Sequence, residues 1–88
     1  MITKEQANEI AVKIDTLGVD EATVSELRQH YQPIHFTYCM DDDLPNNTPV
    51  IEHEGFNLYL IDGREQCLRL TNDYDVATGI VVAEIIPD

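Results

Sequence analysis

The chain is short of positive charge. Only five of its 88 residues are Lys or Arg, against seventeen Asp and Glu, so the formal net charge is −12. Binding to nucleic acid or to an anionic membrane depends on clustered cations that release counterions from phosphate groups. The deficit is even: residues 1–44 carry nine acids and three bases, and residues 45–88 eight and two, so each half sums to −6. Nucleic-acid and membrane partners are therefore not expected.

Long apolar runs, cysteine and serine are also scarce. The chain has no apolar run of about eighteen residues and no signal-peptide core near its start, so we expect a cytoplasmic protein. Two cysteines, Cys39 and Cys67, should stay reduced in that compartment. The single serine, Ser25, lies outside any nucleophile motif, and the four glycines form no phosphate-binding loop. Neither an enzyme nor a bound cofactor is expected.

The first third of the chain predicts two helices. A capping box begins at Thr3, apolar residues follow at helical spacing, and Gly18 suits a helix C-terminus. Asp20 can cap a second helix, which ends before the next proline. We expect helices over residues 3–17 and 21–31, which form a helical hairpin.

Residues 34–88 are expected to be mainly β, because apolar and polar residues alternate from Ile34 onwards. Residues 56–61 and 67–70 flank Asp62-Gly63 and are expected to pair as a hairpin. Leu60 and Leu70 should then lie on the same face of the sheet, because the apolar side chains of both strands must share the core face. The last segment, residues 80–86, is rich in β-branched residues and favours a strand. A helix capped near Asn72 is the alternative.

These elements predict a single domain over residues 1–88 of the α+β class. An N-terminal helical hairpin is followed by a small antiparallel sheet, and the C-terminal segment is either a strand or a helix.

The acidic run Asp41-Asp42-Asp43 follows the predicted strand directly. Together with Tyr38 and Tyr59, it is expected to form an exposed strip of aromatic and acidic side chains. Aromatic rings beside carboxylates suit a partner that presents Arg, because stacking and charge act together. We therefore expect a small accessory module that docks on a larger protein with a basic surface. Its oligomeric state is left open.

Four candidate metal ligands support an alternative, a metal-handling or redox accessory protein. Cys39 and Cys67 lie on strands that could be neighbours, and His35 or His53 could join them. However, His35 and Cys39 lie about 13 Å apart along one strand, too far to share an ion or a proton. No Cys-x-x-Cys pair typical of structural zinc is present. We expect no stoichiometric metal.

A second alternative is a degenerate helix-turn-helix regulator. Residues 18–25 resemble the turn and the start of the recognition helix in helix-turn-helix repressors, and Arg28 and Gln29 would contact bases. Phosphate contacts need several cations, whereas residues 20–31 carry one Arg against three acids. We therefore expect two packed helices joined by a glycine turn.

Two blocks, HFTYCMDDD over residues 35–43 and GFNLYLIDGR over residues 55–64, resemble a family of small, acidic proteobacterial proteins. Some members of that family are encoded among nitrogen-fixation genes. The function of the family is undetermined, so the resemblance implies no catalytic residues. It implies an accessory role in nitrogen fixation or a related redox pathway.

Overall fold

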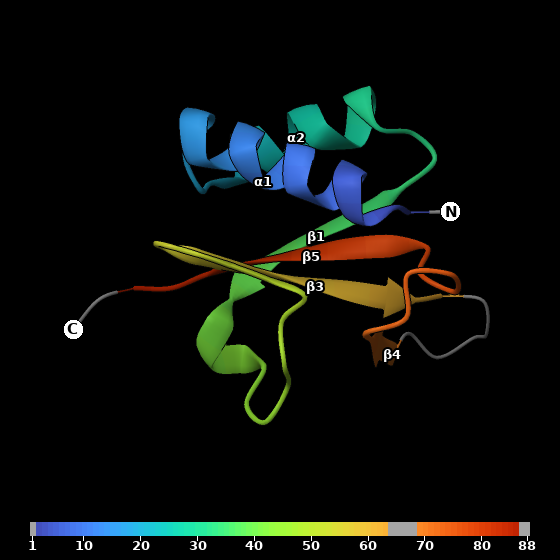
Figure 1. The fold of residues 1–88 in the computed structure, drawn as a ribbon. Coiled ribbons are helices and arrows are strands. Elements are labelled where there is room, and N and C mark those ends of the chain that lie inside the picture. The colour runs from blue at the N-terminus through green and yellow to red at the C-terminus, as the bar shows by residue number, and fades with distance from the viewer. Residues whose placement is uncertain (1, 64–68, 87–88) are drawn as a thin grey trace.

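A computed structural model describes residues 2–63 and 69–86 and shows two helices packed on one face of a sheet (Figure 1). Helix α1, Lys4–Leu17, begins where the Thr3 hydroxyl accepts the Gln6 N–H at 3.0 Å. It ends at Gly18, whose φ of 104° is a conformation that glycine adopts without strain. The capping residues predicted from the sequence therefore bound this helix.

Helix α2, Glu21–His30, follows after a short turn. The Asp20 carboxylate accepts the Thr23 N–H at 2.8 Å and caps its first turn. Both helices bury one face and expose the other, as their apolar spacing predicts. In the described part of the chain, no helix is long and apolar enough to cross a membrane.

The described residues form a five-stranded sheet with the order β1-β5-β3-β2, in which β4 also pairs with β3. The strands are β1 His35–Met40, β2 Ile51–His53, β3 Phe56–Asp62, β4 Arg69–Thr71 and β5 Gly79–Glu84. The central strand β3 pairs antiparallel with β5, β2 and β4. By contrast, β1 pairs with β5 in parallel, so the sheet is mixed and β1 lies at its edge.

The main core lies between the sheet and the helices. Its largest fully buried side chains come from β3, β5 and both helices: Phe56, Leu58, Leu60, Ile80, Val82, Ile10, Ile14 and Val24, with Ile2 from the N-terminal segment. Each such side chain contributes about 1.5–3 kcal/mol when it leaves water. This layer holds the sheet and the helices together.

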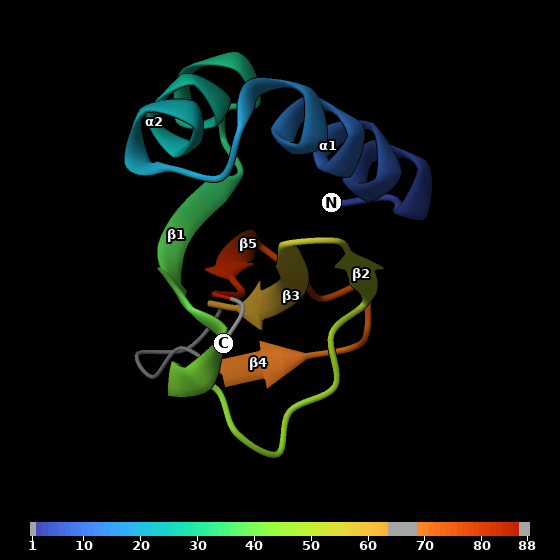
Figure 2. The same cartoon turned by 90° about the vertical axis from the view of Figure 1, so that its left-hand side faces the viewer.

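The opposite face of the sheet is also apolar and carries a second, smaller cluster. Tyr59 and Ile61 from β3 lie beside Val81 and Ala83 from β5, and Leu44 and Leu70 pack against them. Leu44 belongs to the segment between β1 and β2, which begins with the 3₁₀ turn η1, Asp41–Asp43, and passes beneath the sheet (Figure 2). A chain segment without regular strands therefore covers this face.

The α+β class and the order of two helices before the sheet are confirmed. The last segment is a strand, as its β-branched residues favour. The sheet is mixed rather than wholly antiparallel, because the long connection between β1 and β5 allows a parallel pairing.

The expected hairpin register is wrong. Leu70 pairs with Ile61 and lies on the second face, whereas Leu60 faces the helices. Leu60 and Leu70 would have to share a face only if one face of the sheet alone were apolar. Because both faces carry apolar side chains, Leu70 finds apolar neighbours in either register.

Candidate functional site

Acidic side chains from three parts of the fold lie near the C-terminal half of β1. Asp20 and Glu21 at the start of α2 and Glu84 at the end of β5 act on Tyr38, whereas Asp41 and Asp43 of η1, which also contains Asp42, act on Cys39. We call this group the acidic frame. Successive residues of β1 point to opposite faces of the sheet, so Tyr38 lies on the helix side and Cys39 on the other. The frame flanks the strand on both faces.

On the helix side, the Tyr38 hydroxyl donates a hydrogen bond to the Glu84 carboxylate. This bond raises the pKa of Tyr38 to about 12, with smaller contributions from burial and from the charges of Glu84, Asp20 and Glu21. The phenol therefore stays neutral and protonated at physiological pH. It holds one carboxylate oxygen of Glu84 near the strand while leaving the negative charge in place.

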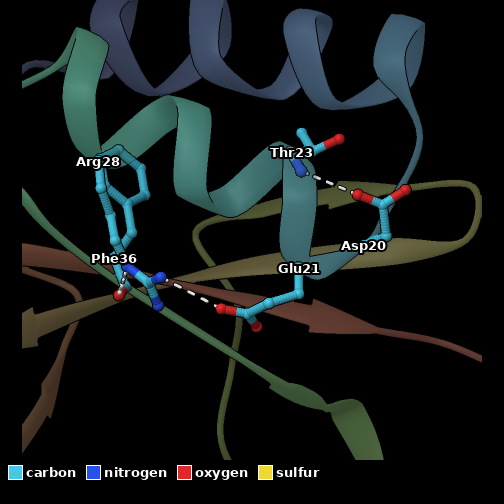
Figure 3. A network of polar contacts seen from close by, with 5 residues as sticks. All are labelled: Asp20, Glu21, Thr23, Arg28 and Phe36. Carbon is cyan, nitrogen blue, oxygen red and sulfur yellow. Dashed lines mark hydrogen bonds and ion pairs between the residues drawn. The ribbon is translucent and has the colours of Figure 1, made fainter.

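Arg28 lies between α2 and β1 on the helix side of the strand (Figure 3). Its Nη1 lies 3.1 Å from a Glu21 carboxylate oxygen, and its Nε donates to the Phe36 carbonyl oxygen at 3.2 Å. The Glu21 side chain is largely exposed, so solvent screens this ion pair and it contributes about 1 kcal/mol or less. Arg28 connects α2 to the backbone of β1.

On the opposite face, Asp41 anchors η1 beneath the sheet. Its Oδ1 accepts hydrogen bonds from the Tyr59 hydroxyl at 2.8 Å and from the Asn57 side-chain amide at 3.0 Å. Asn57 and Tyr59 are buried, whereas Asp42 and Asp43 are exposed. The acidic run therefore divides into one structural carboxylate and two that face solvent.

The expected strip of Tyr38, Asp41, Asp42, Asp43 and Tyr59 is not one surface, and its assignment is corrected. Tyr59 is only 3% exposed and lies on the opposite face from Tyr38, because the two residues stand at alternate positions of the paired strands. A partner cannot reach its ring from solvent. Partner binding by the other four residues stays a prediction.

Sequence reasoning missed the contributions of Glu84 and of the α2 start. Glu84 reaches β1 through the parallel pairing in which it stands opposite Met40. That pairing joins segments more than forty residues apart in the sequence, and no local sequence pattern predicts it. The sequence marks Asp20 as a helix cap, but the approach of Asp20 and Glu21 to Tyr38 depends on the packing of α2 against β1.

The four candidate metal ligands do not converge where the structure describes them. His53 stacks on Phe56 with ring centroids 5.0 Å apart, and its strand β2 lies three strand spacings from β1, roughly 14 Å from Cys39. His35 is four positions from Cys39 on β1, and Cys67 falls outside the described residues. Within residues 2–63 and 69–86, no three His, Cys, Asp or Glu side chains are placed to hold a metal ion.

The Cys39 thiol is poorly suited to ligation or nucleophilic attack. Burial raises its pKa, and the charges of Asp43 and Asp41 raise it further. Since the thiolate is the form that binds metals and attacks electrophiles, its environment favours the unreactive form.

The structure also bears on the helix-turn-helix alternative. The Arg28 guanidinium is held by Glu21 and by the Phe36 carbonyl on the sheet side of α2 (Figure 3). A base contact would require it to leave both partners. The absence of nucleic-acid binding stays a prediction.

A groove between the two helices is a second surface feature. It has a volume of about 590 Å³ and is lined by residues that include Val12, Leu17, Leu27 and Tyr31. Val12 and Leu17 are 59% and 54% exposed, so their apolar side chains face solvent. This groove is a competing location for a docking partner.

Comparison with known proteins gives one match. Residues 9–85 match the model of a family of unknown function, DUF6129, which spans α2, the whole sheet and most of α1. No curated protein and no solved structure matches the chain. Because the match covers most of the sequence, the chain belongs to the DUF6129 family.

Proposed function

We propose that this protein is a small acidic accessory module that docks on a larger, basic protein through the acidic frame around β1. The observation that carries the proposal is the convergence of carboxylates from α2, η1 and β5 on one edge strand. The net charge of −12 also attracts a positively charged partner from longer distances. A partner with clustered Lys or Arg would be attracted to this edge, whereas nucleic acid would be repelled.

The chemistry of the frame suits guanidinium groups in particular. Asp42 and Asp43 are exposed and offer carboxylate oxygens to bidentate donors. Tyr38 is half-buried and neutral, so part of its ring is available for stacking beside the Glu84 carboxylate, on the helix side of β1. Asp41 supports the site indirectly, because its bonds to Asn57 and Tyr59 hold η1 in place.

The proposal includes a cytoplasmic location and no catalytic activity or cofactor of its own. The resemblance to proteobacterial proteins, some encoded among nitrogen-fixation genes, directs the search for the partner to basic proteins of nitrogen fixation or related redox pathways. The raised pKa of Cys39 makes the metal-handling alternative the weaker one.

The test is binding of a cationic probe, a blocked synthetic peptide of alternating arginine and valine, measured by calorimetry at increasing salt. The double variant Asp42→Asn/Asp43→Asn should weaken binding about tenfold at low ionic strength, equivalent to about 1.4 kcal/mol. The difference should shrink as salt rises, because exposed charges are screened within about 10 Å at 0.1 M.

The matched control is Glu5→Gln/Asp75→Asn, which removes two exposed negative charges, one from the first turn of α1 and one from the loop before β5. It changes the net charge by the same amount and should alter the affinity by less than about twofold, since Glu5 lies at the opposite end of α1 from the start of α2, and Asp75 precedes β5, whose other end carries Glu84. If both double variants weaken binding equally, only the net charge matters and the proposed site is wrong.

A further inference from the structure

The outer edge of β1 carries backbone groups without a strand partner. Within the described residues, β1 pairs only with β5. The His35 N–H donates to the Thr78 carbonyl on the β5 side at 3.2 Å. Because backbone groups alternate in direction along a strand, Phe36, Tyr38 and Met40 point their N–H and C=O groups away from the sheet. The contact of Arg28 with the Phe36 oxygen confirms this direction.

Natural proteins protect such an edge with lysine, proline, bulges or a covering segment. β1, with the sequence HFTYCM, contains neither lysine nor proline, and its six residues pair with β5 in unbroken register. A hollow of about 870 Å³ adjoins the first half of β1, lined by Arg28, Phe36 and Thr37 and also by Ile61 and Thr78 on the β5 side of the strand. The outer edge itself lacks the lysine, proline or bulge that would deter an added strand.

Arg28 already occupies one of the positions that an added strand would use. Its Nε donates to the Phe36 carbonyl as a backbone N–H of a neighbouring strand would, and its Nη1 pairs with Glu21 as a partner cation would (Figure 3). Its side chain is 45% exposed, and an added strand would replace both of its contacts, with a backbone N–H for the Phe36 carbonyl and a cation for Glu21. Arg28 thus acts as an internal substitute for the partner.

We propose that an extended basic segment of the partner protein adds to β1 as a new edge strand. This inference rests on the proposed function and specifies its binding mode: main-chain hydrogen bonds to Phe36, Tyr38 and Met40 would give affinity. Arginine or lysine side chains at alternate positions would meet Glu21 and Glu84 on one face, or η1 on the other. A second copy of the chain is disfavoured as the occupant, because two molecules of charge −12 repel each other.

The first test is amide hydrogen exchange, measured residue by residue by NMR, with and without the alternating arginine–valine peptide. The amides of Phe36, Tyr38 and Met40 should exchange at least about tenfold more slowly in the complex. Those of Thr37 and Cys39 should change little, because they already face β5.

The second test uses peptides that are N-methylated at every other residue in one of the two alternating registers. Methylation in the register that faces β1 removes the donated hydrogen bonds and should abolish binding, whereas methylation in the other register should leave it nearly unchanged. Both peptides keep the same charge, so this contrast is independent of the electrostatic attraction.

The third test compares Arg28→Ala with Lys4→Ala, which removes the same charge from an exposed site on α1. Arg28→Ala should tighten binding of the unmethylated peptide at least threefold more than Lys4→Ala, because it frees the Phe36 carbonyl and Glu21. Equal effects of the two variants would contradict the role of Arg28 as a substitute for the partner.

The outcomes separate the two proposals. If the peptide binds with the expected dependence on Asp42 and Asp43 but leaves the three outward amides unprotected, strand addition is overturned and the acidic docking function stands. If the unmethylated peptide does not bind at low salt, the docking function is overturned, and the strand-addition inference fails with it.

Discussion

Replacement of Asp41 by alanine is expected to lower the free energy of unfolding by about 2–3 kcal/mol. The change removes the acceptor of two hydrogen bonds, from the Tyr59 hydroxyl at 2.8 Å and the Asn57 amide at 3.0 Å. Asn57 and Tyr59 are 8% and 3% exposed, so water reaches them poorly once Asp41 is gone. The measurement is urea denaturation followed by circular dichroism.

The matched control is Asp42→Ala, which removes an exposed carboxylate of the same turn. Its effect should lie within about 0.5 kcal/mol of zero, as for most surface substitutions. Asp41→Asn should fall between the two, because its side-chain oxygen can still accept both hydrogen bonds. Equal stabilities of Asp41→Ala and Asp42→Ala would show that these bonds do not hold η1 beneath the sheet.

The second large effect is expected for Gly79→Ala. A Cβ atom at this position would lie 2.8 Å from the His35 carbonyl oxygen and 3.1 Å from its Cβ. Both contacts belong to β1, so the strand must move away from β5 to relieve them. The free energy of unfolding should fall by about 1–3 kcal/mol, the range observed for overpacked sites. Urea denaturation measures this loss.

Thr37→Ala is the control, because Thr37 is an exposed residue of β1. It should cost less than about 1 kcal/mol, the span of strand propensities. In Gly79→Ala the Thr37 amide should also exchange faster with solvent, since the β1–β5 hydrogen bonds weaken. A Gly79→Ala variant as stable as Thr37→Ala would contradict the close approach of the two strands.

Local signals in the sequence were sufficient for the helices and for the class of fold. Thr3, Asp20 and Gly18 act within a few residues of themselves, and the structure places each at the helix end that it was expected to mark. The β-branched segment ending near Ile86 likewise contains a strand, β5. These features depend on contacts between near neighbours, which the sequence order displays directly.

The arrangement of the sheet depends on distant contacts and could not be predicted in the same way. The parallel pairing of β1 with β5 places Tyr38 opposite Val82 and brings Glu84 to the edge strand. Together with the pairing of β5 and β3, it places Tyr59 on the opposite face of the sheet from Tyr38. The acidic run was recognised as part of the site, but the structural role of Asp41 required knowledge of the side chains beneath it.

The central claim is that the edge formed by β1 and its acidic frame is the surface on which a basic partner docks. The most direct measurement is the map of backbone amide chemical shifts as the alternating arginine–valine peptide is added at low ionic strength. The largest changes should fall on β1, η1 and the first turn of α2, and they should diminish as salt is raised. Largest changes along the helix groove, at Val12, Leu17 and His30, or an even spread over the surface, would contradict the claim.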